Sequence, residues 1–182
     1  MPHDGQDIPM TQSALLADLM TLTSAAIPPA EKLFDAARAH VQDRVSKDGR
    51  VSGALLEANQ TAAHGLAWLA TYVEALRQMQ AWAERLQADG KFGEIEQLIH
   101  QIAFGEYLAQ LRGGIPMSQG EIIRLADIGV DAAMLNTPEI DRLVALANTQ
   151  DARTRLVTLM QDQVASTTLG ATGLDEELEL IR

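Results

Sequence analysis

Cysteine is absent from this 182-residue chain, and so is any cluster of basic residues. Without thiols the chain can form no disulfide, no Cys-ligated zinc or iron–sulfur site and no thiol nucleophile. Its 25 acidic residues outnumber its 14 lysines and arginines, giving a formal net charge of −11. Because phosphate contacts need clustered cations, this composition argues against a nucleic-acid-binding protein.

Long hydrophobic runs are also missing. No apolar stretch approaches the ~20 residues that a membrane-spanning helix needs. The N-terminal stretch MPHDGQD is acidic where a signal peptide would be basic. We therefore expect a cytoplasmic protein without a membrane span, in which residues 1–9 are disordered.

What the chain does contain is apolar residues at helical spacing along most of its length, which predicts an all-α fold. A first helix is expected over about residues 11–26. The Pro28-Pro29 pair predicts a turn and then a second helix over residues 29–46. Residues 47–53 have turn composition; Asp48-Gly49 is also a hairpin signal, but no long alternating strands flank it, so the helical interpretation is favoured.

A third helix, over about residues 54–89, is expected to dominate the molecule. It contains no proline and no glycine except Gly65, and Gly90 provides a C-terminal stop. At 1.5 Å per residue it would be a rod of ~50 Å. A fourth helix over residues 92–111 carries a second broad apolar face and can pack antiparallel to it. We therefore predict a helical bundle over residues 10–164 with one very long central helix.

Shorter helices are expected after this pair. Residues 112–121 form the glycine-rich segment, and Ser118 to Glu121 has the spacing of a capping box before a short helix through about Ile128. Three further short helices are predicted, at about residues 131–135, 138–148 with Thr137 as cap, and 152–164.

The C-terminal end has a different composition. Residues 165–173 are small and polar, which indicates a linker. Residues 174–182 begin an apolar stripe after the capping-box spacing of Thr172 to Asp175. Because no helix stop follows, we expect an unfinished terminal helix that needs a continuation or a partner.

Candidate chemistry is sparse. Glu96 and His100 stand four residues apart on the fourth helix, where they could serve a metal ion or acid–base chemistry. No further ligand motif accompanies them, so a solvated helix pair is the favoured interpretation, and we assign no catalytic, cofactor-binding or metal-ligating residue. His64 is expected to be a hydrogen-bonded histidine in the core or at its boundary.

The glycine-rich segment and the two tryptophans also admit more than one interpretation. Gly113-Gly114 could let the backbone approach a ligand closely, and a helix starting near Gln119 could offer free N–H groups to a phosphate. The spacing fits neither a P-loop nor a dinucleotide fingerprint, so a helix end followed by a loop is favoured. Trp68 and Trp82 are interpreted as packing or interface residues.

Three segments carry a resemblance to a known family. Residues 63–77 (AHGLAWLATYVEALR) and 104–119 (FGEYLAQLRGGIPMSQ) resemble the helical extension that precedes the catalytic body in (2S)-methylsuccinyl-CoA dehydrogenases, a branch of the acyl-CoA dehydrogenase family. Residues 173–182 resemble the start of the first helix of an acyl-CoA dehydrogenase body. The resemblance covers roughly residues 10–182.

The resemblance implies a flavoprotein in which a glutamate base removes the α proton of an acyl thioester, a hydride passes to FAD, and electron-transferring flavoprotein reoxidises the cofactor. The implied reaction converts methylsuccinyl-CoA to mesaconyl-CoA in the ethylmalonyl-CoA pathway. The catalytic base, the flavin-binding domain and the CoA-binding helices would all lie beyond Arg182. The residues of this chain are then expected to have a structural or oligomerisation role, with the rest of the dehydrogenase as partner, and no activity alone.

Two alternatives stay open. The first is a free-standing helical adaptor or regulatory protein that docks a partner through its apolar faces. The second is a small enzyme that uses Glu96 and His100. A coding sequence that continues past Arg182 would favour the dehydrogenase extension, whereas a stop codon there with no dehydrogenase nearby would favour the adaptor.

Overall fold

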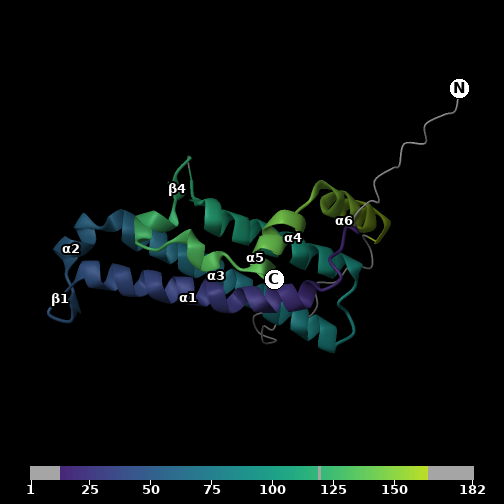
Figure 1. Ribbon diagram of the computed structural model, residues 1–182, viewed down its shortest axis with the longest axis horizontal. Helices are drawn as coiled ribbons and strands as arrows, with labels where there is room; N and C mark the ends of the chain where they lie inside the picture. Colours follow the sequence, from purple (N-terminus) through teal and green to yellow (C-terminus); the bar gives the residue numbers. More distant parts are fainter. Residues whose placement is uncertain (1–12, 119, 164–182) are drawn as a thin grey trace, which may run out of the picture.

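The computed structural model describes residues 13–118 and 120–163. In this part of the chain six α-helices pack with two 3-10 helices and two small hairpins, which confirms the all-α fold class. Figure 1 shows an elongated molecule in which the long helices run along its long axis. The expected disordered N-terminus (1–9), linker (165–173) and terminal helix (174–182) lie outside the described residues.

The first helix, α1 (Leu19–Val45), is continuous, whereas the sequence predicted two helices separated at Pro28-Pro29. That prediction was wrong because one apolar face continues past the prolines, with Ala26 and Ala30 both fully buried. Two backbone donors are lost at the proline rings. Burial of the flanking turns outweighs this loss, since tertiary packing supplies most of the stability of a protein helix.

A tight hairpin follows α1. Strand β1 (Ser46–Lys47) pairs antiparallel with β2 (Arg50–Val51). Between them Asp48 and Gly49 have φ angles of 51° and 73°. Positive φ at both central residues is typical of a type I′ turn. The Asp48-Gly49 signal therefore does form a hairpin, with strands of only two residues each.

The predicted third helix is divided in two. Helix α2 (Gly53–Ala58) and helix α3 (Gln60–Ala88) are separated at Asn59, whose φ of −125° is not helical. The Asn59 side chain donates to the carbonyl oxygen of Leu55 at 2.8 Å. The single-helix prediction failed because a short amide side chain can compete in this way with the helical backbone bonds.

Helix α3 ends near Gly90 as predicted, and Gly90 has a φ of +66°. Helix α4 (Glu94–Gly113) then turns back along it. Helix α3 packs against both α1 and α4. The longest helix of the described chain thus has neighbours on two sides, as its broad apolar stripe required.

The glycine-rich segment forms a second hairpin instead of the predicted short helix. Gly114, with a φ of 125°, is the C-cap of α4, and β3 (Ile115–Pro116) pairs antiparallel with β4 (Ile122–Ile123). The capping box predicted from Ser118 to Glu121 does not form. Instead the Glu121 N–H donates to the Ser118 carbonyl oxygen at 3.1 Å and helps to close the turn of the hairpin.

Four short helices complete the described fold: η1 (Leu125–Ile128), η2 (Ala132–Leu135), α5 (Pro138–Leu146) and α6 (Gln150–Gln163). Thr137 caps α5 as predicted, because its side chain accepts from the Ile140 N–H at 3.3 Å. Helix α5 packs against α1 and α4, and α6 packs mainly against α4. Among the described helices, none is long and apolar enough to cross a membrane.

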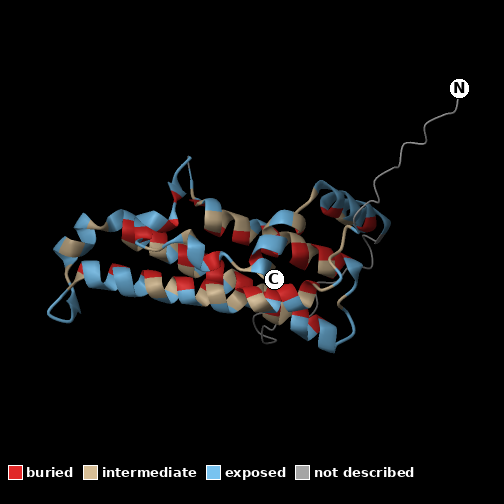
Figure 2. Cartoon of the chain, viewed as in Figure 1, coloured by how far each residue is buried: buried red, intermediate tan, exposed pale blue. Residues whose placement is uncertain are grey.

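Buried residues form two separate apolar cores. Figure 2 shows them on the inward faces of the helices. The main core joins α1, α3, α4, α5 and the β3–β4 hairpin, and Leu33, Leu76 and Phe104 are among its fully buried members. A smaller core lies between α4 and α6, formed by Ile95, Leu98, Ala152 and Leu159. Helix α6 is therefore attached to the bundle by a core of its own.

Candidate functional sites

His100 is fully buried on α4, near the start of α1 and the end of α3. Its Nε2 lies 3.1 Å from the hydroxyl oxygen of Thr23 on α1. The Thr23 hydroxyl itself lies 3.1 Å from the Leu19 carbonyl oxygen, to which it donates. Since that hydroxyl has a single proton, Nε2 of His100 must carry the hydrogen and donate to Thr23. Nδ1 of His100 then holds a lone pair, and this atom has no hydrogen-bond partner among the described residues.

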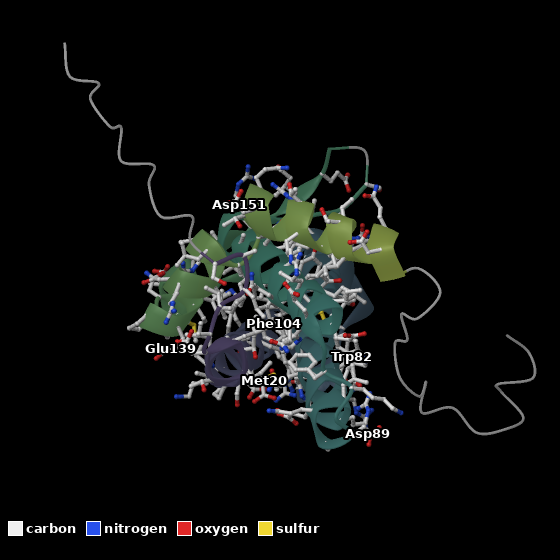
Figure 3. All side chains as sticks on the ribbon, turned by 90° about the vertical axis from the view of Figure 1, so that its right-hand side faces the viewer. Met20, Trp82, Asp89, Phe104, Glu139 and Asp151 are labelled. Atoms are coloured by element: carbon white, nitrogen blue, oxygen red, sulfur yellow. The ribbon has the colours of Figure 1, made fainter. Side chains whose placement is uncertain are left out.

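Aromatic rings surround the His100 imidazole. The ring centroids of Trp82, Phe92 and Phe104 lie 6.5, 5.9 and 4.7 Å from that of the imidazole. Figure 3 views this end of the bundle and shows Phe104 in the interior, whereas Asp89 and Glu139 lie at the periphery. Burial among these rings lowers the pKa of His100 to about 4, because a charged imidazolium would lose its hydration there. His100 is therefore neutral near pH 7.

Glu96 lies one helical turn before His100 and is only 7% exposed. The solvated helix pair favoured from the sequence was therefore wrong for both residues. The spacing of four placed them on one face of α4, but it could not show that α1 and α3 cover that face. In the part of the chain that the structure describes, no three His, Cys, Asp or Glu side chains are grouped so that they could hold a metal ion.

A surface groove of about 420 Å³ brings together two features that the sequence singled out. We call it the hairpin groove. One wall comes from the start of α3 and the other from the β3–β4 hairpin, and the lining residues are Gln60, Thr61, His64, Met117, Glu121, Ile122 and Ile123. Sequence separation concealed this site, because only packing brings α3 and the hairpin into contact.

The two walls meet closely at Gly65 of α3. A Cβ atom at this position would lie 2.8 Å from a methyl carbon of Ile123 and 2.8 Å from one of Ile128. Real Cβ atoms essentially never approach so closely, so the hairpin can seat on α3 only because residue 65 has no side chain. This contact explains the one glycine inside the longest helix.

His64 lines the hairpin groove and is hydrogen-bonded to Trp68 one turn along α3. The indole Nε1–H of Trp68 donates to His64 Nε2 at 3.1 Å. The two rings are almost perpendicular, at 89°. His64 is thus hydrogen-bonded as expected, but its side chain is exposed. Trp68 packs against the main core, which agrees with its interpretation as a packing residue.

The glycine pair Gly113-Gly114 lies at the end of α4, as the favoured interpretation predicted. The alternative, a phosphate site at a helix start near Gln119, is not supported, because β4 occupies Ile122–Ile123 where that helix would continue. Of the described residues on either side of this turn, none begins a helix that could offer its N–H groups to an anion.

Two further hollows of about 400 and 320 Å³ flank the segment Leu16–Asp18 before α1. Among the described side chains that line the three hollows, Arg142 is the only cation. Its Nη1 is already engaged by Asp18 Oδ2 at 2.5 Å. A phosphate-bearing ligand would therefore meet no uncommitted cation in any of the three.

No family model matches the chain. The chain is 58% identical over 175 residues, or 95% of its length, to (2S)-methylsuccinyl-CoA dehydrogenase from Cereibacter sphaeroides. The matched region is 31% of that protein, so the chain spans about a third of the relative's length. The match confirms the resemblance seen in the sequence, and it is a match to a segment.

Proposed function

We propose that this chain is the N-terminal, non-catalytic helical part of a flavin-dependent acyl-CoA dehydrogenase and that its role is structural or in oligomerisation. The observation that carries the proposal is the 58% identity over 95% of the chain to a segment of methylsuccinyl-CoA dehydrogenase. Identity at this level over nearly the whole chain supports a shared fold and a shared position in a larger protein.

For the complete enzyme we propose oxidation of methylsuccinyl-CoA to mesaconyl-CoA, with FAD as cofactor and electron-transferring flavoprotein as electron acceptor. The described residues do not suit a flavin. Their strands are four two-residue segments in two hairpins, and the hollows contain no uncommitted cation for a diphosphate. We therefore assign flavin and thioester binding to the remainder of the complete enzyme.

What the bundle offers to that remainder is a set of uncovered apolar side chains. Large apolar residues with at least 39% exposure are Val51, Leu56, Ile122, Met134, Val157 and Met160. Val157 and Met160 lie one turn apart on α6, the last described helix. Uncovered apolar side chains of this kind suit packing against another part of a protein or against a second subunit.

The experiment compares three proteins: the chain alone, the complete dehydrogenase that contains it, and that dehydrogenase without residues 1–163. We expect the chain alone to be helical by circular dichroism, colourless, and inactive with methylsuccinyl-CoA. We expect the shortened dehydrogenase to show an altered oligomeric state by light scattering. Flavin absorbance or turnover by the chain alone would contradict the proposal, and an unchanged assembly after the deletion would contradict a role in oligomerisation.

The adaptor alternative rests on the same uncovered apolar side chains, which a separate partner protein would also cover. Mass spectrometry of the native protein separates the two proposals. A dehydrogenase polypeptide that contains these residues supports the extension, and a native protein of 19.7 kDa supports the adaptor.

A further inference from the structure

Residues 13–18, which precede α1, lie where the two apolar cores meet, and we call them the strap. Leu15 packs against both the main core and the smaller core, and Leu16 packs against the main core. The side chains of the strap are exposed or half-buried. In Figure 1 this segment runs from the start of α1 towards α6. The strap therefore connects the main bundle with the region in which α6 is packed.

Gln101 of α4 holds the strap by its backbone. The Gln101 Oε1 accepts from the Leu16 N–H at 2.8 Å, and its Nε2 donates to the carbonyl oxygens of Ala14 at 2.8 Å and of Ala147 at 3.1 Å. Gln101 is fully buried, so each bond that it lost would leave a buried polar group unpaired. Its single amide group cannot follow the strap away from α4 and also keep its bond to Ala147, the C-cap of α5. Movement of the strap therefore disturbs the corner between α5 and α6.

The strap also lies beside the start of α6. Strap residues line the hollow of about 320 Å³ together with Thr149 and Asp151. The Thr149 hydroxyl accepts from the Ala152 N–H at 3.2 Å, and Ala152 is a member of the smaller core. Asp18, the last residue of the strap, pairs with Arg142 of α5 at 2.5 Å. The strap, the α5–α6 corner and the start of α6 thus form one connected set of contacts.

We propose that the strap and α6 form one conformational unit that opens and closes together while the main core stays folded. Gln101 is the positioning residue of this unit, because it holds the strap and the end of α5 at the same time. Segments with few fully buried contacts open most readily, and both parts of the unit have few. Val157 and Met160 move with the unit, so the strap sets where the exposed apolar side chains of α6 are presented.

A single cysteine can report opening of the strap, because the chain has no cysteine of its own. Ala14→Cys places the thiol in the strap, and Ala63→Cys is the matched control at a half-buried alanine of α3. In the Ala14→Cys chain we expect Gln101→Met to speed labelling by a thiol reagent roughly tenfold, because the strap loses its hydrogen bonds to a buried amide. In the Ala63→Cys chain the same substitution should leave the labelling rate unchanged.

Amide hydrogen exchange tests whether α6 opens with the strap. We expect Gln101→Met to speed exchange in α6 and to leave exchange in α3 unchanged. The reverse effect separates a shared unit from local damage, because coupling between two parts of a molecule is reciprocal. Glu94→Gln weakens the contact of α4 with Arg155 on α6, in which no strap residue takes part. It should nevertheless speed labelling of the Ala14→Cys chain about twofold.

Asp18→Asn is a milder strap variant, and it decides the test if Gln101→Met unfolds the whole chain. It weakens the ion pair with Arg142. We expect it to speed both labelling of the Ala14→Cys chain and exchange in α6 about twofold. Faster labelling with unchanged exchange in α6 would show that the strap opens alone, and unchanged labelling would show that these contacts do not hold it. Either result would overturn the proposal.

Discussion

At the scale of single residues, the burial of His100 makes the stability of the bundle depend on pH. Its pKa is lowered from 6.5 to about 4 by burial. Unfolded molecules take up a proton near pH 6.5 and native molecules only near pH 4, so stability present above pH 6.5 is lost as the pH falls. Because of His100, the unfolding free energy should be about 2 kcal/mol lower at pH 5 than at pH 7.5.

The substitution His100→Leu should remove that pH dependence, since leucine is apolar and carries no proton. Urea unfolding at pH 7.5 and pH 5 measures the difference. The control is His64→Gln, which replaces an exposed histidine and leaves the His100 contribution in place. If His100→Leu loses as much stability as the parent between the two pH values, the assignment to His100 is wrong.

Gly129 is a second residue at which the structure requires a particular amino acid, here glycine. Its φ is +78°, and a Cβ atom there would lie 2.1 Å from Cδ2 of His40. Gly49 has a similar φ of +73°, but nothing lies within 4 Å of its Cβ position. Gly49→Ala should therefore cost only the left-handed backbone penalty, about 1–2 kcal/mol. Gly129→Ala should cost more, because His40 must also move.

Chemical denaturation of both glycine variants tests this difference. His40→Ala removes the clash. Adding Gly129→Ala to His40→Ala should therefore lower the unfolding free energy only by about as much as Gly49→Ala lowers it in the parent chain. Equal losses for Gly129→Ala and Gly49→Ala in the presence of His40 would show that the imidazole does not hinder residue 129.

At the scale of elements, α1 continues through two prolines, and replacing one of them measures how much stability the prolines cost this helix. Pro28 is exposed within α1, so its replacement loses little packing. Pro28→Ala restores an N–H that can donate to the Ser24 carbonyl oxygen, and should raise the unfolding free energy by up to about 3 kcal/mol. Thermal unfolding followed by circular dichroism measures the gain.

The matched control for Pro28 is Pro138, at the first turn of α5. There a helix needs no backbone donor, so Pro138→Ala should bring no comparable gain. A lower stability for Pro28→Ala than for the parent would indicate a chain break at the two prolines instead of one continuous α1.

Helix α6 contacts α4 through an ion pair as well as through the smaller core. Arg155 Nε donates to Oε1 of Glu94 on α4, and Arg155 Nη2 donates to Oε2 of the same carboxylate, both at 2.7 Å. Hydrogen bonding from Arg155 lowers the pKa of Glu94. Glu94→Gln should therefore speed amide hydrogen exchange in α6 while leaving exchange in α1 and α3 unchanged.

The control for this prediction is Asp35→Asn, which breaks an exposed pair with Arg38 within α1. It should leave α6 exchange at the parent rate. Exchange in α6 that is equally slow in Glu94→Gln and the parent would mean that the smaller core alone holds the helix.

At the scale of the whole molecule, the charge imbalance sets the response to salt. The net charge is −11, so the excess acidic side chains repel one another in the compact state, and added salt screens that repulsion. The melting temperature should therefore rise between low ionic strength and about 0.15 M sodium chloride, where the Debye length is ~8 Å. Differential scanning calorimetry measures the shift, and a fall in melting temperature would show that attractive ion pairs dominate instead.

Helical character and the main boundaries followed from the sequence because they depend on local features. The apolar period of 3.6, the Thr137 cap and the Gly90 stop act within a few residues, and each agrees with the structure. The same local reasoning failed at Pro28-Pro29, at Asn59 and at Ser118. At Asn59 and Ser118, side-chain and turn bonds replaced the expected helix, and at Pro28-Pro29 packing overruled a local breaker.

The candidate sites divide in the same way. Spacing along α4 showed that Glu96 and His100 share a face, and only the tertiary structure showed that α1 and α3 bury that face. Sequence identified His64 and the glycine-rich segment separately, and only packing at Gly65 joined them in one groove. What the sequence determined by itself is the helical content, the acidity and the resemblance, because these are properties of residues and their neighbours. Burial and juxtaposition were decided by the tertiary structure, because they depend on which distant helices meet.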